Sequence, residues 1–446
     1  MAVIGGGISG LVAAYRLRSR LGPDADITIV ETSPRLGGKL RTVDLGSGPV
    51  DIGAEAFIAR RPEIPALLAE LGLSDQIVYP AGLSPLIWSQ GSLHRLPVGT
   101  LMGIPAGGDA VVDLVSPDTL SRIAAERDVP FRWERGSDCS VAQLVSDRFG
   151  DQVVRRSVDP LLGGVYSGLA ETIGVRAALP TLAAALDAGA TSLSDAVAAA
   201  LPTPAPGPVF GALKDGYGVL LDALLGASGA KVITAAASGL RREGTRWFVD
   251  PVGTVDAVIL AVPAPTAAAL LADVAPEASR AAEQIQLASS AVVALRFAGD
   301  IDLPENSGIL VATDADLTAK AFTLSSRKWT HLAQRGDHLV RASFGRFGAA
   351  EIVESPDEEL IALAREDLST VTGITDDPAA AFVQRWRGGL PQYAPGHTAM
   401  VAEIEHGVAE LAGVEVAGSW LHGVGVPACV AVATTAAAQI CDGVAP

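Results

Sequence analysis

The chain has 446 residues, more than one compact core usually holds, so its length predicts two or three lobes. Hydrophobic residues make up 49% of it, which provides an ample core, and the net charge of −17 argues against nucleic acid or an anionic membrane as the main partner. Its three cysteines, Cys139, Cys429 and Cys441, lack paired spacing, which predicts neither a disulfide framework nor a metal site. We expect a cytoplasmic protein.

A glycine-rich turn follows the first apolar segment of the chain. Residues 2–4 predict a strand, and an apolar helix is predicted after the turn. The G-x-G-x-x-G spacing allows a tight turn, close approach of the backbone to a pyrophosphate and packing of the helix on the strand. The phosphates would lie at the positive end of that helix. The turn consists of Gly5, Gly6, Gly7, Ile8, Ser9 and Gly10.

An acidic residue closes the next predicted strand. Residues 27–30 are apolar, and Glu31 follows 21 residues after Gly10, where a carboxylate can bind ribose hydroxyls. The glycine turn alone could be a plain strand–helix turn. Together with Glu31 and its neighbour Thr32 it predicts a dinucleotide-binding fold.

A second glycine pair, Gly37-Gly38, precedes Lys39. With Glu31 it forms the pattern E-x-x-x-x-x-G-G-[RK], which resembles the FAD sites of the monoamine oxidase and porphyrinogen oxidase superfamily. The alternative is a hairpin turn with solvated basic residues. The resemblance implies non-covalent FAD, with contacts from Gly38, Lys39, Gly53, Ala54, Glu55 and Ala56.

The middle of the chain lacks regular alternation of strands and helices. Two strands are expected around the turn Gln90-Gly91, and a proline-rich segment at 202–208 ends this region. Helices are predicted at 117–127, 140–157 and 178–200.

Alternation resumes after the proline-rich segment. The strand that contains Val232 would return to the first lobe, and the superfamily resemblance places Val232 beside the adenine; a plain core strand is the alternative. A second sheet is predicted from the apolar segments at 289–298 and 338–346.

The last stretch combines a strand, a glycine loop and an apolar helix. Residues 416–441 contain no charged side chain and are long enough to span a bilayer, but the glycine loop within them makes a poor membrane helix. We therefore expect a core helix and no transmembrane anchor. In the superfamily this loop meets the flavin, and the helix dipole would stabilise the charge of a reduced flavin. The implied contacts are Trp386, Gly418, Val424, Gly425 and Val426.

These elements predict an α/β fold. It consists of a Rossmann-like FAD-binding domain of the glutathione reductase/monoamine oxidase type, an inserted helical lobe and an α+β substrate domain. The FAD-binding domain is expected to be assembled from three separate segments, at 1–75, 211–288 and 386–446. The inserted lobe would occupy 76–210, and the sheet of the substrate domain 289–385.

Four stretches resemble the oxygen-dependent porphyrinogen oxidases in particular. They are Gly5 to Gly10 with Glu31 and Lys39, Asp51 to Phe57 with residues 60–63, Leu161 to Gly168, and Leu390 to Tyr393 with Gly396-His397. The resemblance implies removal of six electrons from a porphyrinogen in haem biosynthesis, with oxygen as acceptor and hydrogen peroxide as product. The flavin N5 carries this chemistry, so no catalytic side chain is assigned.

Two departures from the family pattern bear on the substrate. Ser419 stands where an aspartate is usual, which leaves a carboxylate contact to the flavin in question. Ser84-Pro85 stands where animal protoporphyrinogen oxidases have a propionate-binding arginine. These features favour the bacterial type that resembles coproporphyrinogen III oxidases. The candidate substrate contacts are Arg60, Arg61, Gly164, Tyr166 and Tyr393, with solvated arginines and core-packed tyrosines as alternatives.

Other functions stay open at this point. The nearest are oxidation of protoporphyrinogen IX, an amine oxidase or a carotenoid desaturase of the same superfamily. A scaffold that has lost its flavin is a non-catalytic alternative. The expected partners are the porphyrinogen, molecular oxygen and a downstream haem-pathway enzyme that receives the product.

Overall fold

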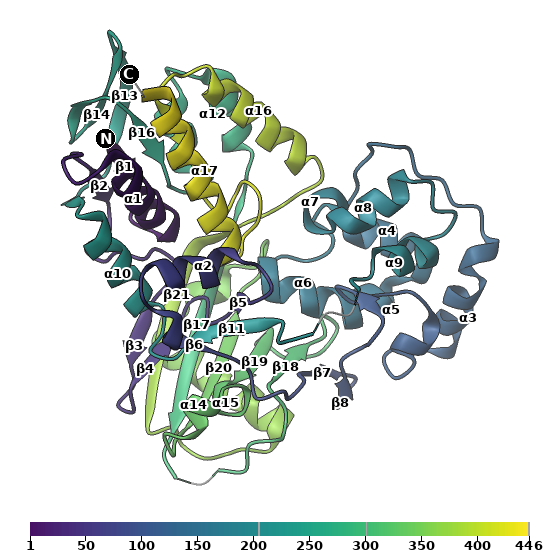
Figure 1. Ribbon diagram of the computed structural model, residues 1–446. Helices are drawn as coiled ribbons and strands as arrows, with labels where there is room; N and C mark the ends of the chain where they lie inside the picture. Colours follow the sequence, from purple (N-terminus) through teal and green to yellow (C-terminus); the bar gives the residue numbers. More distant parts are fainter. Residues whose placement is uncertain (204–205, 300, 445–446) are drawn as a thin grey trace.

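The computed structural model describes residues 1–203, 206–299 and 301–444 (Figure 1). Two residues of the proline-rich segment, 204–205, lie outside the described residues. Three lobes are distinguished here: a parallel-sheet lobe built on five strands, a mixed-sheet lobe built on seven strands, and a helical lobe between residues 106 and 203. In Figure 1 the helical lobe lies on the right, in blue and teal.

Five parallel strands form the centre of the parallel-sheet lobe. Val3 pairs with Ile29 on one side and with Ile259 on the other, and all three are fully buried or nearly so. Such short apolar strands suit a parallel sheet whose two faces are both covered. In sheet order they are β12 (Lys231–Thr234), β2 (Thr28–Glu31), β1 (Ala2–Ile4), β16 (Val258–Leu260) and β22 (Val414–Val416).

Helices pack on both faces of this sheet. One core lies between the sheet and α1 (Ile8–Leu21), α2 (Glu63–Glu70), α10 (Gly218–Ser228) and α17 (Val426–Val444). The other core lies under α11 (Ala264–Leu271), α12 (Pro276–Glu283), α16 (His397–Ala409) and a small sheet of β13 (Ser238–Glu243), β14 (Arg246–Asp250) and β15 (Gly253–Val255).

α17 lies alongside α1 in the first of these cores (Figure 1). Among the described residues, α17 alone has the length and apolar composition of a membrane span, over Val426–Gly443. Half of that stretch is buried inside the protein, as a core helix would be.

The mixed-sheet lobe contains the predicted second sheet. α15 (Asp357–Thr372) packs on it, and α13 (Ser325–Lys328) and α14 (Thr330–Ala333) follow β19. In sheet order its strands are β21 (Ala380–Pro391), β17 (Leu287–Phe297), β20 (His338–Phe344), β19 (Ala321–Leu324), β18 (Gly308–Val311), β7 (Leu86–Ser89) and β8 (Ser92–Arg95).

Strands of this sheet do not follow the predicted units. The hairpin β7–β8 turns at Gln90-Gly91 as predicted, yet it pairs with β18 in the mixed sheet rather than staying with the helices. β21 runs through the boundary predicted at 385/386. The division of the chain into five units therefore stays a prediction.

The helical lobe has its own apolar core. The predictions of single helices at 140–157 and 178–200 were wrong, because Gly150 and Gly189 have φ of +94° and interrupt them. The helices are α3 (Pro117–Ala125), α4 (Val141–Phe149), α5 (Asp151–Val153), α6 (Asp159–Tyr166), α7 (Val175–Ala178), α8 (Pro180–Asp187) and α9 (Leu193–Ala200).

Short strand pairs link the lobes. The strand that follows the helical lobe, β11 (Phe210–Leu213), lies between β5 (Phe57–Ile58) and β6 (Ile77–Val78). The chain thus returns beside the point where it left the parallel-sheet lobe. The remaining pairs are β3 (Thr42–Asp44) with β4 (Pro49–Asp51) and β9 (Thr100–Leu101) with β10 (Ile104–Pro105).

Candidate cofactor and substrate site

The first glycine turn is packed as closely as a phosphate-binding turn requires. A Cβ on Gly10 would lie 1.8 Å from the Gly5 carbonyl oxygen, and Gly5 itself has φ of +108°. α1 begins after Gly7 without a side-chain cap, so the N–H groups of its first turn are open to an anion. The residues from Ile8 to Gly10 form that first turn and are buried.

The Glu31 carboxylate lies directly against this turn. Its Oε2 accepts the Gly6 N–H at 2.7 Å, and its Oε1 accepts the Ser33 N–H at 2.8 Å and the Thr32 hydroxyl at 3.2 Å. These bonds hold the carboxylate at the end of β2, the predicted ribose position. Ribose binding by Glu31 and Thr32 stays a prediction.

The second glycine pair lies on the first. The Gly37 N–H donates to the Gly6 carbonyl at 2.8 Å, and a Cβ on Gly38 would lie 3.1 Å from Gly7 Cα. Both residues have positive φ, so glycine is needed for the turn as well as for the close approach. The two motifs, separate in the sequence, thus form one surface.

Lys39 extends from that surface toward the C-terminal loop. Its Nζ lies 3.5 Å from Ser419 Oγ, and burial lowers the pKa of its ammonium. Across residues 1–203, 206–299 and 301–444, no carboxylate forms an ion pair with it. A partly buried cation without a counterion, set between two glycine loops, fits the anionic pyrophosphate or flavin of FAD.

Replacing Lys39 by methionine is expected to affect cofactor binding and apoprotein stability differently. The affinity for FAD should fall about 10- to 100-fold, the equivalent of one charge-assisted contact. The free energy of unfolding of the apoprotein should not fall, because the charge it loses has no carboxylate partner. Titration of apoprotein with FAD and urea unfolding measure the two effects. Lys231→Met, at an exposed pair with Asp26, is the control and should change neither; a parallel loss of affinity there would contradict the role of Lys39.

Gly53 and Trp386 are brought beside Lys39. A Cβ on Gly53 would lie 2.1 Å from the Lys39 carbonyl oxygen and 3.1 Å from Trp386 Cζ2, and the Trp386 indole N–H donates to the Ile52 carbonyl at 3.4 Å. Ala54 is exposed and Ala56 partly buried. This places three of the predicted cofactor segments in one continuous set of contacts.

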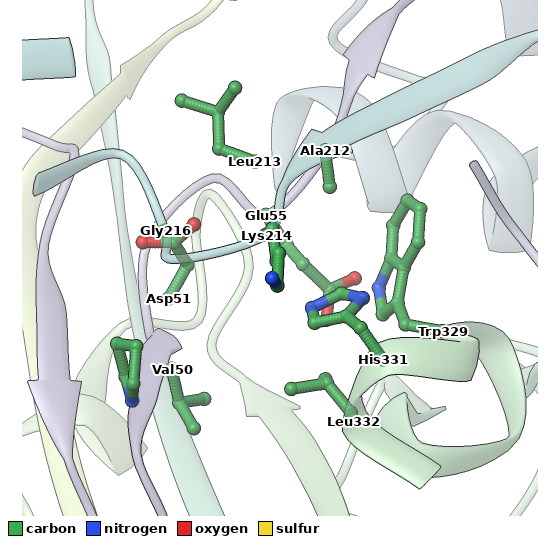
Figure 2. Close-up of a pocket in the computed structure, with 11 residues that line it drawn as sticks. Val50, Asp51, Glu55, Ala212, Leu213, Lys214, Gly216, Trp329, His331 and Leu332 are labelled. Carbon is green, nitrogen blue, oxygen red and sulfur yellow. The ribbon is translucent and has the colours of Figure 1, made fainter. Parts of the chain in front are cut away.

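The Glu55 side chain lies beside His331 and Trp329 (Figure 2). Its carboxylate accepts a hydrogen bond from Ser325 at 2.9 Å and pairs with Lys328 Nζ at 2.8 Å and Arg341 Nη1 at 3.4 Å. Burial alone would raise its pKa, but Lys328 and Arg341 hold the pKa at about 2. We infer that any contact of residue 55 with the cofactor uses its backbone.

A cavity of about 20 Å³, room for one water molecule, lies between Glu55, Asp51 and His331 (Figure 2). Asp51 accepts two hydrogen bonds of 3.1 Å from the Tyr217 N–H, and burial raises the pKa of Asp51 to about 7. The cavity belongs to the seam between the parallel-sheet and mixed-sheet lobes and is far too small for a porphyrinogen.

Val232 lies midway along the edge strand β12. It is 42% exposed and pairs with Ile29, whereas Thr234 pairs with Glu31. The Ala235 N–H donates to the Glu31 carbonyl at 2.9 Å. The residues that follow β12 therefore lie beside Glu31. The sequence did not predict this, because the register between two strands cannot be deduced from the sequence of one of them. The adenine contact of Val232 stays a prediction.

The C-terminal glycine loop closes the site. Gly418 has φ of +154°, and the loop leads through Val424 and exposed Gly425 into the N-terminus of α17 at Val426. The Tyr393 hydroxyl forms hydrogen bonds with this loop at Ser419 and Gly423.

The candidate substrate residues are distributed over two places. Tyr166 and Tyr393 pack against each other with ring centroids 5.5 Å apart, and exposed Gly164 faces open space on the same helix as Tyr166, α6. Arg60 and Arg61 lie in the loop before α2, where Arg60 donates to the Gly207 carbonyl and Arg61 pairs with Glu63. Their contacts with substrate stay predictions.

A buried lysine near α6 was missed from the sequence. Lys320 donates to Ser167 Oγ at 2.6 Å and to the Gly345 carbonyl at 2.7 Å. Burial, with a contribution from Arg346, lowers its pKa to about 7. Lys320 ties the end of α6 to the mixed sheet, and the only sequence signal was a lone lysine between two alanines.

Comparison with known proteins identifies the family of this chain. The chain matches the family described as "Flavin containing amine oxidoreductase" over residues 8–441. A Mycobacterium tuberculosis protein named coproporphyrinogen III oxidase is 53% identical over 99% of this chain and 97% of its own. One of the same name from Bacillus subtilis is 29% identical over 96% and 95%. A solved structure from Exiguobacterium sp. 255-15 has a TM-score of 0.86 and 29% identity, over 99% of this chain and 98% of that one.

The family match settles three predictions made from the sequence. It confirms the α/β fold with a Rossmann-like FAD-binding domain, the flavin cofactor FAD, and the class of oxidoreductase. It runs from the start of α1 into the last turns of α17, and so includes the end of the first glycine turn, the whole of the second and the C-terminal loop. The chain belongs to the flavin-containing amine oxidoreductase family.

Proposed function

We propose that this enzyme oxidises coproporphyrinogen III to coproporphyrin III in haem biosynthesis. The observation that carries the proposal is the 53% identity, over nearly the whole of both chains, to the M. tuberculosis protein of that name. The sequence stretches that contain Tyr166 and Tyr393 also support it, because they resemble porphyrinogen oxidases and not amine oxidases.

The chain's own residues bind and orient in this proposal. Bound FAD supplies the acceptor for the six electrons that leave the porphyrinogen in three steps, with oxygen as final acceptor and hydrogen peroxide as product. Lys39 and the α1 N-terminus bind the cofactor anion, and Glu31 fixes the first turn beside the ribose position. Lys320 holds the end of α6 in place, and we expect the macrocycle to lie against this end of the helix.

The other functions considered above have less support. The intact contacts among Gly7, Gly38 and Lys39 oppose a scaffold that has lost its flavin. Residues 386–393, the region in which amine oxidases attach their flavin through a cysteine, contain no cysteine, which supports non-covalent FAD. We further propose a cytoplasmic enzyme that passes its product to a downstream haem-pathway enzyme; the unpaired state of Cys139, Cys429 and Cys441 supports a reducing compartment.

Coproporphyrinogen III is expected to have a higher kcat/KM than protoporphyrinogen IX. It carries four propionates against two, and a charge-assisted contact contributes roughly 1.5–3 kcal/mol when desolvated and much less at an exposed rim. The preference should therefore lie between a few-fold and about a hundredfold. Porphyrin fluorescence kinetics under matched oxygen measure it. Equal or faster turnover of protoporphyrinogen would overturn the substrate assignment.

A further inference from the structure

Tyr393 lies where the helical lobe meets the C-terminal glycine loop. Its side chain is 2% exposed, and its backbone carbonyl accepts the Gly174 N–H at 2.7 Å. The preceding residue, Gln392, donates from its side chain to the Tyr166 carbonyl at 2.8 Å. The segment is thus fixed to the helical lobe on both sides of the tyrosine ring.

The Tyr393 hydroxyl both donates and accepts a hydrogen bond with the glycine loop. It donates to the Ser419 carbonyl at 2.7 Å and accepts the Gly423 N–H at 2.7 Å. Burial raises the pKa of this hydroxyl well above its usual value, so it keeps its proton and both bonds. One hydroxyl therefore bridges two points of the loop four residues apart.

The Tyr393 ring is packed against two other rings. His397, 1% exposed, stacks on it with centroids 3.9 Å apart and an interplanar angle of 18°, and Tyr166 packs on it at 5.5 Å. Burial lowers the pKa of His397 to about 4, so a neutral ring stacks on the tyrosine at neutral pH. Such packing holds the hydroxyl in place.

We propose that Tyr393 is a positioning residue for the flavin, which it serves by fixing the loop at residues 418–426, and is not a substrate contact. Ser419 faces Lys39 on the other side of the loop, so the hydroxyl and the lysine together define where the loop can lie. The proposal rests on the family's flavin site and on the loop's predicted contact with it. It holds whichever porphyrinogen is oxidised.

The test compares Tyr393→Phe with the matched control Tyr166→Phe. The first removes both bonds to the loop, and the second changes the neighbouring ring without touching the loop. Tyr393→Phe should weaken the binding of FAD to apoprotein about tenfold and shift the reduction potential and visible spectrum of the bound flavin. Tyr166→Phe should leave the affinity, potential and spectrum as in the wild type.

A second variant and a stability measurement separate positioning from folding. Ser419→Ala removes the contact with Lys39 but retains the backbone carbonyl that Tyr393 uses, so its flavin potential should change less than that of Tyr393→Phe. Thermal unfolding should show that both apoproteins fold cooperatively, with Tyr393→Phe unfolding at a somewhat lower temperature because it loses two buried hydrogen bonds. Wild-type affinity and potential in Tyr393→Phe, or equal changes in Tyr166→Phe, would overturn the proposal. Failure of the wild type to oxidise coproporphyrinogen would overturn the proposed substrate and leave this comparison intact.

Discussion

Gly10→Val is expected to give a protein without flavin, or no folded protein. Even the first atom of a side chain would lie 1.8 Å from the Gly5 carbonyl oxygen and 3.0 Å from its carbon, and both belong to rigid backbone. Relief would require α1 to move off β1, which would open the turn that holds the pyrophosphate. The ratio of flavin absorbance to protein absorbance after purification, and circular dichroism of the product, measure the outcome.

Gly226→Ala is the matched control for this change. Gly226 also lies in a helix of the same lobe, α10, but a Cβ there meets no atom within 4 Å. This variant should keep its flavin and be as stable as the wild type or slightly more stable, since alanine favours helix. Recovery of fully loaded, active Gly10→Val would show that the first turn is not the phosphate site.

Glu55→Gln is expected to lower the free energy of unfolding by about 3–5 kcal/mol, because it leaves the charges of Lys328 and Arg341 without their buried partner. Urea unfolding of the apoprotein at pH 7 measures it. The control is Glu354→Gln, which breaks the exposed pair with Arg387 and should cost less than about 1 kcal/mol. Similar losses in both variants would show that the Glu55 pair is worth no more than a surface pair.

The Glu55 effect should also depend on pH in one direction. Its pKa is lowered from 4.5 to about 2, so its stabilising contribution is complete above pH 4.5 and disappears as pH falls toward 2. The shift corresponds to about 3 kcal/mol. The difference in stability between wild type and Glu55→Gln should therefore be constant from pH 5 to 7 and shrink below 4.5. A difference that grows in acid would contradict the low pKa.

Short-range signals allowed much of this site to be predicted. The glycine turn and its helix are adjacent, from Gly5 to Leu21, and the spacing from Gly10 to Glu31 reflects one helix and one strand. The structure places both glycine pairs and Lys39 together. The strand pair around Gln90-Gly91 could also be predicted, because two adjacent strands and a tight turn form a local sequence pattern.

What could not be predicted depends on contacts between distant segments. Glu55 lies in a stretch that was predicted to bind the cofactor. Its side chain instead pairs with Lys328, 273 residues away in the sequence, and this contact could not be predicted. Ile87 was expected in the inserted lobe, but its strand belongs to the mixed sheet, where it pairs with Leu310. Tyr393 was predicted as a substrate contact from its aromatic ring, and its hydrogen bonds with Ser419 and Gly423 could not be predicted from the sequence.

The order of strands in the parallel sheet has a consequence for synthesis of the chain on the ribosome. β16 (Val258–Leu260) has β1 on one side, but its other neighbour, β22, is made more than 150 residues later. Until then the nascent protein presents a bare strand edge, and the face of α1 that α17 covers remains open. A chain that stopped before Val414 would retain the glycine turns and Lys39 and still be prone to aggregation. We therefore expect the complete flavin site to form only after residues 414–444 have been made.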